Sequence, residues 1–136
     1  MKNKPTVIIA GLILKNNKVL CIRQDKGDYK DFIWAPAGHL EPNEALKEGV
    51  IREVKEETGL DVKIKKLVMK VEYSQLLFYF YLCDIIGGKL STKGEIKKIF
   101  WLSFNKILKS DKVHPVLYLV ASLSIHKPNF YEGIEK

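Results

Sequence analysis

The sequence predicts one α/β domain in which a mixed β-sheet lies between two helices. A chain of 136 residues is long enough for one hydrophobic core and too short for two. Several short apolar runs are separated by turn residues, as strands are. Two longer segments, 44–58 and 113–125, have helical periodicity. No repeat, low-complexity tract or linker interrupts the chain, so residues 1–136 are expected to form a single domain.

The first strands are expected to form a hairpin. Val7 to Leu14 and Val19 to Gln24 are β-rich runs, and the dipeptide Asn16-Asn17 lies between them. Asparagine tolerates the left-handed backbone that a short hairpin turn requires. A polar loop, Asp25 to Asp31, then leads to an apolar segment.

The first helix is predicted at Glu44 to Thr58. Its start is marked by Pro42 and Asn43 and by the acidic residue that follows them, and Gly59 stands where a helix would end. The stripe that faces the core is expected to consist of Leu46, Val50 and Val54.

Three carboxylates share another face of this helix. At about 100° per residue, Glu53, Glu56 and Glu57 fall within an arc of roughly 100°. Arg52 can pair with Glu48 or Glu56, so at least two of the three carboxylates are expected to lack a counter-charge. A solvated acidic face is one interpretation, because like charges at this spacing cost only a few tenths of a kcal/mol.

Gly49 favours a binding site over a solvated face. A glycine in a helix interior costs about 1 kcal/mol relative to alanine. This glycine lies one turn before Glu53, on the carboxylate face. The sequence therefore predicts that a loop packs closely against the helix there.

The second half of the chain is predicted to supply three strands and the second helix. The segment Gln75 to Cys83 is almost continuously apolar, as a strand buried on both faces would be. The other expected elements are a strand at Asp61–Val71, a turn at Gly87-Gly88, a strand at Ile96–Leu102, and a helix at Val113–Ile125 with Pro115 in its first turn.

The net charge of +7 and the pI near 9.3 indicate an anionic partner. Nucleic acid is not the favoured one, because the lysines are dispersed and accompany no nucleic-acid-binding motif. A membrane span is not expected, since no run reaches the ~18 apolar residues needed. Cys21 and Cys83 lie in apolar runs and are interpreted as buried free thiols of a cytoplasmic protein. The positive charge alone fits a phosphorylated small molecule, a membrane surface or nucleic acid.

The acidic helix resembles the signature box of the Nudix hydrolases. Gly38, Glu44 and the run Arg52-Glu53-Val54-Lys55-Glu56-Glu57-Thr58-Gly59-Leu60 match it, and weaker similarity extends from about Val7 to Leu102. Ala37 departs from the pattern, because the family usually has glycine there. The resemblance implies an α-β-α sandwich and a hydrolase that cleaves a nucleoside diphosphate linked to another group. Clustered carboxylates without soft ligands independently favour Mg²⁺, with Mn²⁺ as the other candidate.

The resemblance also implies roles for box residues. Glu56 and Glu57 match the principal metal ligands, Glu53 matches a metal ligand or base, and the Gly38 carbonyl matches a further ligand. Structural roles are expected for the remaining two positions: Arg52 would fix the carboxylates by ion pairing, and Glu44 would order the loop before the helix.

Four further residues are candidates for the site. Glu95 lies where many relatives place an additional acidic residue, Arg23 could bind phosphate, Trp34 could stack on a base, and His39 follows the proposed metal-binding carbonyl. Each has a simpler interpretation. Glu95 could be an exposed loop acid and Arg23 a surface charge, while Trp34 could pack in the core and His39 could form a hydrogen bond within its loop. His114 and His126 carry no signal.

The expected substrate is a small nucleotide. Trp34 to Glu41 resembles the box entry of small Nudix phosphatases that act on nucleoside tri- and diphosphates and on pyrimidine pyrophosphates. The alternatives are a larger substrate, such as a dinucleoside polyphosphate or ADP-ribose, and a non-catalytic Nudix-like nucleotide-binding module. A homodimer is compatible with the sequence.

Overall fold

The computed structural model describes residues 5–91 and 96–126. The expected N-terminal hairpin is confirmed: β1 (Thr6–Lys15) and β2 (Lys18–Gln24) are antiparallel, with Leu14 opposite Val19. Asn16 and Asn17 have φ angles of 52° and 61°. Both turn residues therefore adopt the left-handed conformation that matches the twist of a two-residue hairpin.

A mixed seven-stranded sheet is built around β1. One edge of β1 pairs in parallel with β6 (Leu76–Gly88), and the other edge pairs with the short strand β4 (Ala37–His39) and then with β2. The outer strands are β5 (Leu60–Tyr73), which pairs with β6, and β3 (Ile33–Trp34) and β7 (Ile96–Leu102), which pair with β2. The sheet order is β3-β2-β1-β6-β5, with β4 and β7 beside β1 and β2.

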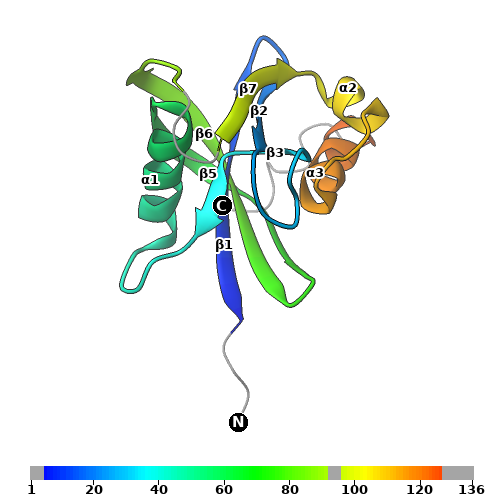
Figure 1. The fold of residues 1–136 in the computed structure, drawn as a ribbon. Coiled ribbons are helices and arrows are strands. Elements are labelled where there is room, and N and C mark those ends of the chain that lie inside the picture. The colour runs from blue at the N-terminus through cyan, green and yellow to red at the C-terminus, as the bar shows by residue number, and fades with distance from the viewer. Residues whose placement is uncertain (1–4, 92–95, 127–136) are drawn as a thin grey trace.

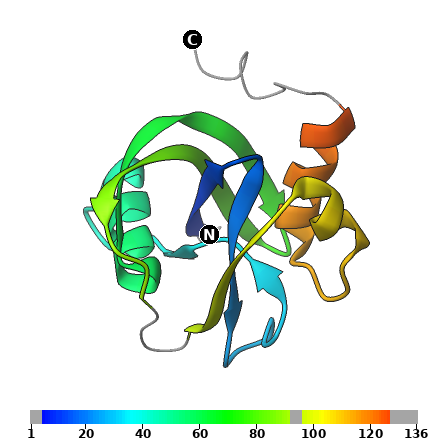
Figure 2. The same ribbon diagram turned by 90° about the horizontal axis from the view of Figure 1, so that it is seen from above.

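Helices cover both faces of the sheet, which confirms the predicted sandwich. Figure 1 shows α1 (Leu46–Thr58) on one side and α3 (Pro115–His126) with α2 (Phe104–Lys109) on the other, and Figure 2 shows the same layers from above. Side chains of β1 alternate between the two layers. Ile9 and Ile13 pack with Val50 and Val54 of α1, whereas Leu12 packs in the cluster that contains Leu117 and Val120 of α3.

The helix α1 begins two residues later than predicted. Glu44 precedes it, and Glu48 closes its first turn by accepting a hydrogen bond from the Ala45 N–H at 3.2 Å. Its end is as expected, because Gly59 has a φ of 81° and donates its N–H to the Lys55 carbonyl. Val50 and Val54 are fully buried, as the predicted core stripe requires.

The close approach predicted at Gly49 is confirmed. A Cβ on this residue would lie 2.5 Å from Ile9 Cδ1 and 2.9 Å from Glu44 Oε1, and 3.0 Å from Leu40 Cδ1. One strand and the loop before α1 therefore both press against the helix at the one position without a side chain.

Replacing Gly49 with alanine is expected to destabilise the fold by about 1–3 kcal/mol, as overpacking in a dense core does. This cost exceeds the gain in helix propensity of about 1 kcal/mol. Urea denaturation of both forms measures the difference. Gly87→Ala is the matched control, because a Cβ there would meet nothing closer than Asp61 Oδ2 at 3.5 Å. A Gly49→Ala variant as stable as the parent would refute the close approach.

Several short elements were not predicted, and one turn was wrong. The strands β3 and β4 have two and three residues, and α2 has six, so none is long enough to show a period. Gly87 and Gly88 do not form a turn but continue β6, opposite Asp61 and Leu60. A Cβ on Gly88 would lie 2.8 Å from the Asp61 amide nitrogen. Gly88 therefore permits close backbone contact, and neither glycine reverses the chain.

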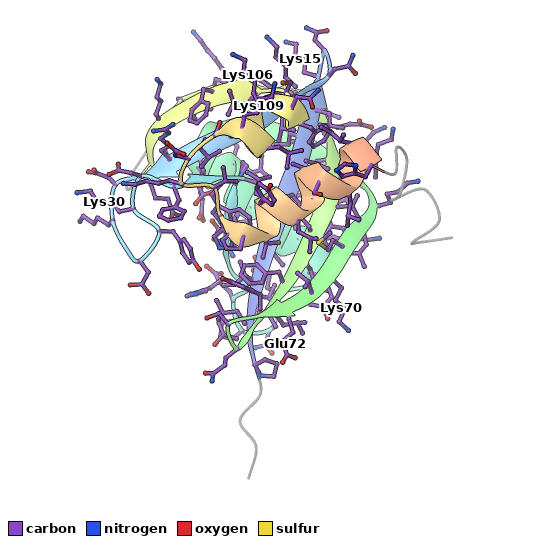
Figure 3. All side chains as sticks on the ribbon, turned by 90° about the vertical axis from the view of Figure 1, so that its right-hand side faces the viewer. Lys15, Lys30, Lys70, Glu72, Lys106 and Lys109 are labelled. Atoms are coloured by element: carbon purple, nitrogen blue, oxygen red, sulfur yellow. The ribbon has the colours of Figure 1, made fainter. Side chains whose placement is uncertain are left out.

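The surface charge and the cysteines follow the expectations from sequence. Lysines project from separate elements, among them Lys15 of β1, Lys70 of β5 and Lys106 of α2 (Figure 3). Cys21 and Cys83 are buried and free, and burial raises the pKa of each thiol to about 12. Throughout the described ranges, every helix is too short or too polar to cross a bilayer.

Candidate active site

A cavity of about 380 Å³ opens where β4, α1 and the start of α3 meet, and its volume is in the range of small-molecule sites. Its walls combine two carboxylates, several polar loop and strand groups, and a set of aromatic rings on an apolar base. These residues are Glu53 and Glu57; Gln24, Gly38 and His39; Tyr29, Trp34, Phe78 and His114; and Ile8, Ala37 and Leu76. The sequence places them far apart, and the sheet brings them together.

Glu57 is anchored to the sheet. Its Oε1 accepts a hydrogen bond of 2.8 Å from the backbone N–H of Ala37, the first residue of β4. Burial, and to a lesser degree the nearby Glu53 and Glu56, raise the pKa of Glu57 to about 8, although the hydrogen bond from Ala37 opposes this shift. An ionised Glu57 is therefore costly in the protein alone, and a bound cation would remove that cost.

Glu53 lies directly against Gly38. A Cβ on Gly38 would overlap the carboxylate group of Glu53, with Oε2 at 2.6 Å. Burial raises the pKa of Glu53, and the ion pair with Arg52 partly offsets this effect. Only glycine at position 38 lets the strand β4 and the carboxylate occupy neighbouring space.

Arg52 holds the carboxylates in place through the expected partner Glu56 and through two partners that the helical spacing did not predict, Glu44 and Glu53. Its Nε and Nη2 bind the two oxygens of Glu44 at 2.7 and 2.9 Å, and Nη1 binds Glu53 at 2.9 Å. Nη1 also lies 3.2 Å from Glu56 Oε2, while Nη2 donates to the His39 carbonyl at 3.2 Å. The prediction of two carboxylates without a counter-charge is wrong, because one guanidinium serves Glu53 and Glu56 together.

Glu44 has the loop-ordering position expected of it. Its Oε1 also accepts the backbone N–H of Glu41 at 3.0 Å. The hydrogen bond from Arg52 is the main cause that lowers the pKa of Glu44 to about 2, and these contacts in turn raise the pKa of Arg52. The pair ties the loop before α1 to the helix one turn before Glu56.

The donor set suits a hard divalent cation, which favours oxygen ligands. Glu53 and Glu57 face the cavity beside the Gly38 backbone, and Glu56 lies on the exposed side of Arg52. No three His, Cys, Asp or Glu side chains in the described residues already converge on one point. Arg52 is the physical reason, since it engages the oxygens of Glu53 and Glu56 that a cation would take.

The aromatic wall contains a residue that the sequence did not reveal. His114, the residue before α3, is 4% exposed, and its ring stacks on Trp34 with centroids 3.9 Å apart and planes 19° apart. Trp34 also meets Phe80 edge to face at 5.8 Å. Trp34 therefore both lines the cavity and packs in the core. The only available signal for His114 was its place before Pro115, which is typical of a helix cap.

Of the remaining candidates from sequence, one lines the cavity, one lies elsewhere and one is outside the described residues. His39 lines the cavity. Arg23 does not: it lies over the ring of Phe100, 5.4 Å from the ring centroid, and lines a separate cavity with Asp31 and Lys112. The expectation that Arg23 contacts a phosphate in this site is therefore not supported. Glu95 lies outside the described residues.

Comparisons with known proteins agree with this geometry. The chain is 32% identical over 111 residues to an ADP-ribose pyrophosphatase of Methanocaldococcus jannaschii, an alignment that covers 77% of this chain and 66% of the relative. It is 30% identical over 124 residues to the human 8-oxo-dGDP phosphatase NUDT18, covering 88% of this chain and 38% of the relative. The chain thus spans less than two thirds of either relative.

A solved structure and a family model identify the fold and the family. The NUDIX hydrolase from Nitrosomonas europaea superposes with a TM-score of 0.78 at 24% identity, over 90% of this chain and 89% of that structure. The family model described as the NUDIX domain matches residues 2–121. The resemblance seen in the box is thereby confirmed, and the chain belongs to the NUDIX domain family.

Proposed function

We propose that this chain is a Mg²⁺-dependent hydrolase that cleaves a phosphoanhydride bond in nucleoside di- and triphosphates or related small pyrophosphates. The observation that carries this proposal is one cavity that joins Glu53 and Glu57 to an aromatic wall. A phosphate chain suits the carboxylate end once a cation is present, and a flat base suits the other end. Family membership and relatives named pyrophosphatase and phosphatase support it.

The metal would be held by Glu53, Glu56, Glu57 and the Gly38 carbonyl, with Mn²⁺ as a substitute for Mg²⁺. When bound, it lowers the pKa of a water and offsets charge on the phosphates. The hydrogen bond from the Ala37 N–H keeps Glu57 oriented, and a cation would take the oxygens of Glu53 and Glu56 that Arg52 Nη1 binds in the protein alone.

Glu53 is either one of these ligands or, among the described residues, the candidate base that accepts the proton of the attacking water. Its partial burial raises its pKa above that of an exposed glutamate, which makes the carboxylate a stronger base at neutral pH. Glu95 is the other candidate base, on the strength of the family pattern alone. His39 would help to bind substrate, through a side chain at the rim of the cavity.

The cavity volume favours small substrates. At about 380 Å³ it lies at the low end for small-molecule sites. Nucleotides or pyrimidine pyrophosphates are expected to be hydrolysed at least ~10-fold better, in kcat/KM, than ADP-ribose or dinucleoside polyphosphates. ADP-ribose is the second candidate, because the archaeal relative is named an ADP-ribose pyrophosphatase.

The buried free cysteines fit a reducing compartment, and we propose the cytoplasm.

Chromatographic analysis of the products tests the proposal over a panel of nucleoside di- and triphosphates, thiamine-type pyrophosphates, ADP-ribose and diadenosine tetraphosphate. Turnover is expected with Mg²⁺ or Mn²⁺, to increase towards alkaline pH, and to vanish in excess EDTA until metal is restored. Undiminished turnover in EDTA would refute the metal dependence. Binding without any turnover would favour the non-catalytic module, and a first rank for ADP-ribose would favour the second candidate.

A further inference from the structure

The ring of His114 packs against several other aromatic rings in the cavity wall. Trp34 stacks on one side at 3.9 Å, and Tyr29 lies 4.4 Å away at an interplanar angle of 43°. Phe78 meets the same ring at 66° and 5.5 Å. Because an imidazole N–H lies in the plane of the ring, the ring edge is the part that can form a hydrogen bond with a bound molecule.

One ring nitrogen is already committed. Nδ1 accepts the backbone N–H of Val116 at 3.1 Å, which satisfies one of the free amides at the start of α3. An acceptor carries no proton, so the proton of the neutral ring lies on Nε2. Burial lowers the pKa of His114 to about 4, and the ring is therefore neutral near pH 7.

The other nitrogen is a donor without a protein acceptor. Within the described residues, Nε2 forms no hydrogen bond, and the ring is part of the cavity wall. Nε2 is also accessible from outside the protein core. Among the described residues, Arg23 Nε is the one side-chain nitrogen or oxygen that is buried without a hydrogen-bond partner, so the unpartnered Nε2 of His114 is not buried. His114 thus presents one fixed N–H to whatever fills the aromatic end of the cavity.

We propose that His114 is a specificity-determining residue that donates its Nε2–H to a carbonyl oxygen of the base. The inference rests on the proposed function and narrows its substrate class to nucleotides with a keto base, such as guanine, hypoxanthine, uracil or thymine. An amino group of adenine or cytosine would instead place two donors against each other, and both would lose a partner.

Among the other lining groups, the apolar side chains and Gln24 do not offer the same discrimination, whereas the indole N–H of Trp34 is a second group that donates and cannot accept. Ile8, Leu76 and Phe78 supply apolar surface. Gln24 also lines the cavity, but its amide can present either a donor or an acceptor. His114 cannot adapt in this way, because Val116 fixes its tautomer.

The test uses substrate pairs that differ in the group at one ring position, dITP against dATP and dUTP against dCTP. In the full chain with Mg²⁺, the keto member of each pair is expected to have at least a ~10-fold higher kcat/KM, the effect of about one hydrogen bond. Equal values in both pairs would overturn the inference.

Two variants separate the donor from the helix cap. Asparagine in His114→Asn can still accept the Val116 N–H, as asparagine does at helix N-caps, but it is too short to place a donor where Nε2 lies. Glutamine in His114→Gln reaches about that position and gives up the cap. The keto preference is expected to fall below ~3-fold in both variants, because the glutamine amide can also accept a hydrogen bond. The kcat/KM for the keto substrates should fall in His114→Asn and be largely kept in His114→Gln, whose amide can still donate, while the Tm falls more in His114→Gln. An undiminished preference in His114→Asn would overturn the inference.

A binding measurement keeps this result distinct from the proposed function. Isothermal titration with dIMP and dAMP needs no turnover and should show the same keto preference and the same loss in His114→Asn. Keto-selective binding without hydrolysis of any compound would sink the proposed function and leave the role of His114 standing. Hydrolysis without keto preference would do the reverse, and the absence of both would reject both.

Discussion

Replacing Glu57 with glutamine is expected to lower kcat by about 1,000-fold or more, which corresponds to about 4 kcal/mol of transition-state stabilisation. Glutamine keeps the oxygen that accepts the Ala37 N–H, so the side chain retains its place against β4. It lacks the charge that would hold a divalent cation. Glu56→Gln is expected to act in the same direction, and steady-state kinetics at saturating Mg²⁺ measure both.

Glu48→Gln is the matched control for these variants. Glu48 lies on the same helix and accepts the Ala45 N–H, a capping role that glutamine also fills. The control should keep the parental kcat. Near-parental turnover by Glu57→Gln would show that the carboxylates of this helix are not the catalytic centre.

The stability of the same variant reports the pKa of Glu57. The folded protein binds a proton at this group up to about pH 8, whereas the unfolded chain releases it near 4.5. Between these values the folded state holds more protons, so the free energy of unfolding decreases as pH rises. In EDTA at pH 8 and above, Glu57→Gln should therefore melt several degrees higher than the parent, and near pH 4 this difference should disappear. An inactive variant that melts lower at pH 8 would indicate a damaged fold.

Local patterns were enough to predict the parts of the site that come from one helix. The period of α1 showed that Glu53, Glu56 and Glu57 share a face, and Gly49 showed where another segment approaches. The same pattern predicted the contact of Arg52 with Glu56 but missed its pair with Glu44, which lies eight residues away in the loop. A wheel cannot show that contact, since it depends on how the loop folds back.

The sequence named Trp34 as a candidate, but the arrangement of the aromatic wall could not be predicted because it is assembled by strand pairing. Trp34 enters the sheet through β3, and His114 reaches it from the far end of the chain, where its N–H binds the Ile33 carbonyl at 2.9 Å. Arg23 was a candidate from sequence, but its side chain does not line the cavity. Its neighbour Gln24 lines the cavity instead, and the register of β2 against β7 shifts between these two residues. Successive side chains of a strand point to opposite faces of the sheet, so a shift of one residue in strand register decides which side chain enters a site. Sequence alone does not predict that register.

Adding one methyl group at Gly38 is expected to lower kcat by about 100-fold while the protein remains folded. The backbone of Gly38 does not have a positive φ, so alanine meets no conformational penalty there. Its Cβ would instead overlap the carboxylate of Glu53, which is the end of a flexible side chain and can swing away. A displacement of about 1 Å at a catalytic group can cost this much.

Kinetics with Mg²⁺ and circular dichroism would be recorded for Gly38→Ala and for the control Gly87→Ala. The control adds the same methyl group at the end of β6, where it would make only ordinary van der Waals contacts. Since the displaced carboxylate would be a poorer metal ligand, Gly38→Ala should also need more Mg²⁺ for half-maximal rate. Parental rate and parental Mg²⁺ dependence would show that Glu53 works from a different position than the one it has against β4.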